Sequence, residues 1–180
     1  MTRARDVSRL VTTPPNIYAT DTETSSAGYL TNASASTIYS TISSNKVVQI
    51  KTASVSGTTS STSTSYVDTN LTVSITPTSA SNKILVGLFQ LTQKNAGNNY
   101  SGVSLRLLRN ATAILTIGTG IGFTETSVNN RTTTGCFYLD EPATTSATTY
   151  KTQFASGVSG NVAYVNTDGA STILVMEVTP

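Results

Sequence analysis

Residues 65–93, SYVDTNLTVSITPTSASNKILVGLFQLTQ, constrain the fold of this chain more than any other stretch of its sequence. Polar and apolar residues alternate over 71–76, and this period of two predicts a strand with one buried face. The following segment, 83–93, is apolar on both faces, as expected for a central strand that is buried between two layers. A proline and several small polar residues separate the two segments and indicate a turn. The stretch therefore predicts layered β-structure.

The rest of the chain has the same succession of strand-like segments and turns. Apolar or alternating segments recur at spacings of roughly 8 to 14 residues, which is typical of a sandwich or a jelly roll. The Asn/Gly-rich 94–100 and the pair Asp168-Gly169 predict hairpin turns. The Gly-rich 118–123 predicts a bend or bulge, and the hydroxyl-rich 56–65 is either a loop or a flat edge strand. About nine strands are expected, over 46–55, 71–76, 83–93, 102–110, 113–118, 132–140, 148–156, 161–166 and 171–178.

Composition agrees with this class of structure. The 180 residues include 35 Thr and 24 Ser, against 11 Lys and Arg and 9 Asp and Glu. Threonine has a β-branched side chain that suits a pleated, half-exposed surface better than a helix, and no segment predicts a helix longer than one turn. The fold class is therefore all-β, an antiparallel β-sandwich or jelly roll. The length suits one such domain at 46–180, preceded by an extended N-terminal arm at 1–45.

The first 45 residues differ in character from the rest. Three arginines and one acid occupy the first nine residues, while the remainder of the chain carries eight basic and eight acidic residues. The pair Pro14-Pro15 ends this basic segment, and 16–45 shows no sustained period and buries too little to fold by itself. We expect an arm that lies along a partner surface, with arginines pairing with acidic groups and apolar residues as anchors. The candidate binding residues are Arg3, Arg5, Arg9, Leu10, Val11, Ile17, Tyr18, Tyr29 and Leu30.

Side chains suited to catalysis are scarce. The chain has no histidine, so acid–base work near neutral pH would require a tuned pair of carboxylates. Only Asp140 and Glu141 are adjacent, and neighbours on a strand face opposite ways. The sequence holds no DxDxDG calcium loop, and GTGIG at 118–122 lacks the GK[ST] ending of a phosphate-binding loop. We therefore expect no enzyme activity, no catalytic residue, no metal site and no cofactor.

The sequence also disfavours membrane and nucleic acid as partners. No window approaches the roughly 18 apolar residues of a membrane span, and no apolar segment follows the first arginines as it does in a secretory signal. The neutral body lacks the clustered basic stripe of a nucleic-acid-binding face. The single cysteine, Cys136, excludes an internal disulfide. It is expected to be a small buried hydrophobe in a strand, the alternative being an intermolecular disulfide or a reactive thiol.

Three segments resemble small virion surface proteins of tailed phages, especially those of marine and cyanobacterial hosts. SYVDTNLTVSITPTSASNKILV at 65–86 is similar to a theme of that family, in which a [FY]-V-D-T-G-L-like turn, an alternating strand and an SxSKILV strand follow a hydroxyl-rich run. Asn70 stands where glycine is commoner, and both residues tolerate a left-handed turn. The opening MTRARDVS is similar to the particle-attachment end of several such proteins, and STILVMEV at 171–178 to the last strand of the domain. The resemblance implies a homotrimeric β-sandwich on the virion surface, anchored by its N-terminal arm and assembled in the host cytoplasm.

Two functions fit this resemblance. The first is a capsid decoration or cement protein, a virion structural protein whose arm binds the major capsid protein or another virion protein, and the compact length favours it. The second is a tail-fibre or receptor-binding component that recognises a host-surface glycan through tip loops at 94–102 and 161–169, although no shaft, heptad or fibre repeat is present. A phage-surface esterase or depolymerase and a non-viral adhesin or lectin are the remaining alternatives.

Overall fold

The structure is a computed structural model and describes residues 46–97 and 99–180. The arm predicted at 1–45 lies outside this range. Within the described residues the chain forms ten strands and no helix. The strands are β1 (Val47–Val55), β2 (Thr59–Ser61), β3 (Val67–Ile75), β4 (Lys83–Lys94), β5 (Ser101–Arg109), β6 (Thr112–Thr124), β7 (Asn130–Asp140), β8 (Thr148–Ser156), β9 (Ala163–Val165) and β10 (Ser171–Val178).

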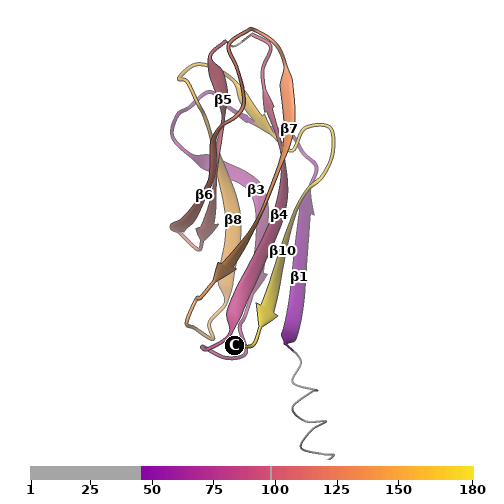
Figure 1. Cartoon of the computed structure of the whole chain (residues 1–180), viewed down its shortest axis with the longest axis vertical. Helices are drawn as coiled ribbons and strands as arrows, with labels where there is room; N and C mark the ends of the chain where they lie inside the picture. The colour runs from indigo at the N-terminus through magenta and orange to yellow at the C-terminus, as the bar shows by residue number, and fades with distance from the viewer. Residues whose placement is uncertain (1–45, 98) are drawn as a thin grey trace, which may run out of the picture. The chain divides into compact units, whose positions relative to one another are not determined.

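Eight long strands form two antiparallel sheets that face each other (Figure 1). In the first, sheet A, the order is β1-β10-β4-β7; in the second, sheet B, it is β3-β8-β5-β6. The short strands β9 and β2 extend sheet A beside the last residues of β4. Two four-stranded sheets connected in this way make a jelly roll. The predicted fold class, an antiparallel β-sandwich or jelly roll, is confirmed.

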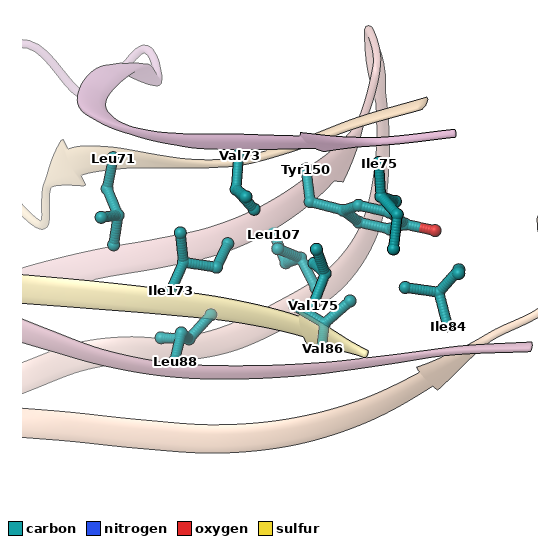
Figure 2. Packing of buried hydrophobic residues seen from close by; sticks show 10 residues of the cluster. All are labelled: Leu71, Val73, Ile75, Ile84, Val86, Leu88, Leu107, Tyr150, Ile173 and Val175. Atoms are coloured by element: carbon teal, nitrogen blue, oxygen red, sulfur yellow. The ribbon is translucent and has the colours of Figure 1, made fainter. Parts of the chain in front are cut away.

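The core lies between the two sheets and is made by alternate residues of each strand. Leu71, Val73 and Ile75 of β3 are buried, as the alternation over 71–76 predicts. Figure 2 shows them facing the side chains of sheet A, with the ring of Tyr150 among them. The burial of each such side chain contributes about 1.5–3 kcal/mol to folding. The remaining buried members of this cluster are Ile84, Val86, Leu88, Leu107, Ile173 and Val175.

The prediction of two hairpins is wrong, because the strands that flank each turn do not pair with each other. Residues 94–100 connect β4 of sheet A to β5 of sheet B, so this turn crosses between the sheets. The strands on either side of Asp168-Gly169, β9 and β10, pair with the same edge of β4 rather than with each other. At Asp168, which adopts a φ of 59°, the chain leaves the sheet and returns to it without reversing, because β9 and β10 are both antiparallel to β4 and therefore run in the same direction. A turn signal specifies a local bend, whereas the choice of partner strand depends on residues far away in the sequence.

For two segments the sequence leaves two conformations open, and the structure shows which one each segment adopts. In the hydroxyl-rich 56–65, three residues form the edge strand β2 on β9 and the others form loop. The Gly-rich 118–123 lies inside β6, where the pairing with β5 shifts register, so the predicted bulge is confirmed. The bulge brings the strands very close, because a Cβ added to Gly102 would lie 2.7 Å from the backbone of Gly120.

The central strand β4 is covered by the described residues on one face only. Its inner residues are buried against sheet B, as predicted. On the outer face Phe89 remains 57% exposed. The prediction that 83–93 is buried on both faces is therefore confirmed for the inner face. The described residues do not bury the outer face.

Candidate functional site

The nine arm residues predicted to bind the particle, from Arg3 to Leu30, lie outside the residues that the structure describes. Their role therefore stays a prediction from sequence. Polar side chains gather at three places in the described sandwich. These are the loops at one end, the outer face of sheet B, and the interior between the sheets.

The loops at the end farther from the C-terminus come together (Figure 1). The backbone N–H of Asn95, just after β4, donates to the carbonyl of Val162 at 3.4 Å. A third loop joins them, because Asn129 Oδ1 accepts a backbone N–H from the residue after Asn95 at 2.7 Å. The two segments predicted as tip loops, 94–102 and 161–169, are thus neighbours in space, which their separation in sequence does not reveal.

Tyr100 provides an aromatic ring at this end of the sandwich. Its side chain is 60% exposed and its φ is 48°. Nearby, Asn161 Nδ2 donates to the carbonyl of Asn99 at 3.5 Å. An exposed ring beside amide groups has the elements that sugar binding uses, a stacking face and hydrogen-bonding groups.

An open groove of about 440 Å³ lies on the outer face of sheet B beside a bulge in β3. Asn70 occupies the bulge with a φ of 68°, in the left-handed region that asparagine and glycine tolerate. Glycine would adopt this conformation without strain. The residues that line the groove are Asp68, Asn70, Leu71, Thr72, Asn110, Thr149, Lys151 and Thr152.

A chain of polar contacts borders this groove. Asp68 accepts hydrogen bonds from Lys151 Nζ at 2.8 Å and from Gln153 Nε2 at 2.6 Å. Gln153 Oε1 in turn accepts two bonds from Arg106, whose guanidinium lies 4.1 Å from the ring centroid of Tyr66. The hydrogen bond from Lys151 lowers the pKa of Asp68 against the opposing effect of burial. Three strands supply these side chains, so only the sheet register, and no local motif, could have identified the group.

The adjacent acids Asp140 and Glu141 hold different partners. Asp140, the last residue of β7, is 4% exposed and accepts bonds from Arg109 at 3.0 and 3.1 Å and from the Tyr150 hydroxyl at 2.6 Å. Glu141 forms an exposed ion pair with Lys83 at 2.6 Å. The carboxylates do not converge, as strand geometry predicts, and only Asp140 is buried. Burial raises the pKa of Tyr150 far above its usual range, and the bond to Asp140 adds to this shift.

Glu177 is fully buried and has no cationic partner among the described residues. Its Oε1 accepts bonds from Asn82 Nδ2 at 2.7 Å and from the N–H and hydroxyl of Thr78 at 2.7 and 2.8 Å. Its Oε2 accepts a bond from Gln49 Nε2 at 2.7 Å. Burial alone would raise the pKa of Glu177, but these hydrogen bonds outweigh it and lower the pKa to about 2. The carboxylate is therefore a structural anion that joins β10 to β1 and to the turn before β4.

Five polar residues form a closed network between the sheets. Thr152 Oγ1 donates to Gln90 Oε1 at 2.7 Å and lies 2.6 Å from the hydroxyl of Thr69. Gln90 Nε2 donates to Asn166 Oδ1 at 2.5 Å and to Ser171 Oγ at 3.0 Å. Asn166 Nδ2 returns to the carbonyl of Thr69 at 2.7 Å. Each member is buried and satisfied by another, so the network fixes the alignment of the sheets and leaves no group free for a ligand.

Metal-ligating side chains and the single cysteine are predicted from the sequence to form no reactive site. Within 46–97 and 99–180, no three His, Cys, Asp or Glu side chains gather where they could hold a metal ion. Cys136 of β7 is half-buried against the core, less completely than predicted. Burial raises the pKa of its thiol, which keeps it protonated and poorly nucleophilic. In the same part of the chain, no helix is long and apolar enough to cross a membrane.

Comparison with known proteins gives no match to a family model or to a curated protein. Among solved structures, the VP2 subviral particle of infectious bursal disease virus is similar with 10% identity and a TM-score of 0.46, over 74% of this chain and 33% of that chain. The structure of the Gx strain of that virus is similar with 14% identity and a TM-score of 0.44, over 73% and 32%. The chain thus spans about a third of the length of these viral chains. The function proposed below rests on the residues of this chain.

Proposed function

We propose that this chain is a structural protein of a phage virion, a capsid decoration or cement protein that binds the particle through its N-terminal arm. The observation that carries the proposal is that nearly all carboxylates of the described sandwich are bonded to other groups of the chain. Among the described residues, every acid except Glu125 accepts an ion pair or a hydrogen bond from within the chain. Carboxylates that are bonded within the chain hold the sandwich together, which suits an architectural role.

The fold is compatible with this role but does not select it. Jelly rolls occur in viral capsid proteins and in lectins, and one fold hosts many functions. The resemblance of 65–86 to virion surface proteins of tailed phages favours the virion. The basic, anchor-rich arm at 1–45 supports attachment to the major capsid protein or another virion protein, and we propose a homotrimer as the attached form.

Electron microscopy of labelled particles tests this proposal. Antibody raised against residues 46–180 is bound to purified particles of the phage that encodes the chain. Label spread over the heads is the expected result. Label confined to the tail would overturn the decoration role, and particles without label would overturn any role in the virion.

The convergence of the loops around Tyr100 favours a second candidate function, glycan recognition by a tail-fibre or receptor-binding component. In that case the full chain binds purified host-surface polysaccharide, and Tyr100→Ala weakens the binding about tenfold through loss of ring stacking. Tyr66→Ala, on the outer face of sheet B, is the matched aromatic control and leaves binding unchanged. Absence of polysaccharide binding by the wild-type chain excludes this function.

A further inference from the structure

The outer face of sheet A carries no charged side chain over three rows of residues, and most of these residues are apolar. Because Ile84, Val86 and Leu88 point into the core, the alternate residues of β4 and their cross-strand neighbours point outward. Phe137 on this face is 70% exposed and Ile50 is 50% exposed. The sheet register arranges the outward residues in three uncharged rows, Ile50-Met176-Leu85-Leu139, Thr52-Leu174-Gly87-Phe137 and Ser54-Thr172-Phe89-Gly135.

Two phenylalanine rings are set into this face. A Cβ added to Gly87 would lie 2.8 Å from Cε1 of Phe137, and a Cβ added to Gly135 would lie 3.0 Å from the ring of Phe89. Each ring therefore covers a glycine on the neighbouring strand, a reciprocal cross-strand arrangement. Rings that are already held in place lose little conformational entropy when a partner covers them. The face is thus organised for contact before any partner arrives.

Two ion pairs within the chain lie at the margins of the face. Lys83 Nζ lies 2.6 Å from Glu141 at one end, and Arg131 Nε lies 2.7 Å from Asp168 at the other. A charged partner would find no complementary group in the rows. A second copy of the chain presents the same uncharged rows, so two copies meet without repulsion. Interfaces between identical subunits are also the more apolar class.

The area of the face is sufficient for self-association. Four strands about 4.8 Å apart and three rows about 7 Å apart cover roughly 20 by 20 Å. With the relief of the side chains this is on the order of 500 Å² per copy, or about 1,000 Å² in a pair, the lower bound of a specific interface. An exposed apolar patch of this size on a monomer is usually functional.

From these observations we infer that the outer face of sheet A is the surface through which one copy of this chain binds a second copy. The inference adds to the proposed function a pairwise, two-fold contact between copies, which is separate from the contacts that would build the proposed homotrimer. It rests on the proposed function only for the setting of copies side by side on a particle. It also gives a physical reason for the sequence of β4, which is apolar on both faces although the described residues cover only one.

Sedimentation velocity of the full chain tests the inference. The wild type is expected to sediment as an oligomer at micromolar concentration. Phe137→Lys and Leu139→Lys each place a charge in the buried rows and are expected to weaken association at least about tenfold. The matched control is Val158→Lys, which puts the same charge at a 42% exposed apolar position in the loop after β8, and it should associate like the wild type.

Folding and function are separated from association by two further readouts. Thermal unfolding checks each variant, and Leu139→Lys leaves both ring–glycine pairs in place if Phe137→Lys fails to fold. A monomeric wild type, or folded variants that still associate, would overturn the inference. If the chain labels particles but is monomeric, the interface fails and the proposed function stands. If the variants disperse the oligomer but particles carry no label, the interface stands and the proposed function fails.

Discussion

The hydroxyl of Tyr150 donates a 2.6 Å hydrogen bond to Oδ2 of Asp140, and this bond joins the two sheets at one end of the core. Tyr150 lies on β8 of sheet B and Asp140 ends β7 of sheet A. Arg109 of β5 completes the group with an ion pair at 3.0 Å. A buried carboxylate of sheet A is thereby satisfied by two side chains of sheet B.

Replacement of this tyrosine is expected to destabilise the protein. Tyr150→Phe keeps the buried ring but leaves one lone pair of a charged, buried carboxylate without a donor. We expect the free energy of unfolding to fall by about 2 kcal/mol, measured by urea denaturation. Tyr164→Phe is the control, because the Tyr164 hydroxyl makes no hydrogen bond with the described residues. Equal stability of the two variants would show that the Tyr150–Asp140 bond contributes nothing.

Stability in acid should depend on Glu177. Its pKa is lowered from 4.5 to about 2, so the folded state binds this proton less readily than the unfolded state. Its contribution is present above pH 4.5 and is lost as the pH falls from 4.5 toward 2. Glu177→Gln removes this titration and places an amide donor opposite Gln49, so we expect lower stability at pH 7 and a shallower loss in acid.

Unfolding free energies measured across that pH range check the Glu177 prediction. Other carboxylates with lowered pKa, such as Asp68, also lose stabilising contacts in acid, so the quantity to compare is the difference between wild type and variant. Glu125→Gln serves as the control because Glu125 is exposed. Parallel curves for wild type and Glu177→Gln would contradict the prediction.

Because β5 and β6 approach closely, any side chain at Gly102 is expected to destabilise the protein. A Cβ at this position would lie 2.7–2.8 Å from backbone atoms of Gly120, and backbone cannot move aside as a flexible side chain can. We expect Gly102→Ala to lower the free energy of unfolding by about 2–3 kcal/mol. Gly57→Ala, where no atom lies within 4 Å of the added Cβ, should change it by less than about 0.5 kcal/mol. Similar values for both would show that the bulge tolerates separation of the strands.

Removal of the first 15 residues tests the arm. The described core, including Leu71 and Ile84, is built from residues after 45, so we expect the truncated chain to keep its thermal unfolding midpoint. It should no longer bind particles, because Arg3, Arg5 and Arg9 are lost with it. A charge-reversed full chain with glutamate at these three positions separates charge from length. Saturation of particles by the truncated chain with unchanged affinity would disprove the attachment role.

The sequence predicts the strands well because their signals are local. Alternation over 71–76 places Leu71 and Val73 in the core, and Asn70 marks a left-handed bulge by its residue type. Each of these features follows from side-chain chemistry within a few positions. The jelly-roll class follows from the number and spacing of such segments.

Pairing and polar partners depend on long-range geometry and are not readable in the same way. Gln49 and Glu177 are 128 positions apart and meet only because β1 lies beside β10. The turn residues at Asp168 predict a reversal, yet β9 and β10 run in the same direction along one edge of β4, which is long enough for two neighbours. The candidate arm residues lie outside the described structure, so that part of the site stays a prediction.

The first and last described residues of the sandwich are bonded to each other. The carbonyl of Lys46 accepts the N–H of Thr179 at 3.0 Å, and Lys46 Nζ donates to the carbonyl of Pro180 at 3.0 Å. A short linker can therefore close the domain into a ring, and the backbone can be reopened elsewhere by circular permutation, for example near Gly57. The same closeness makes the sandwich a transplantable module. Grafted into a surface loop of another protein, it would enter and leave at one point and keep the loops around Tyr100 at its opposite end.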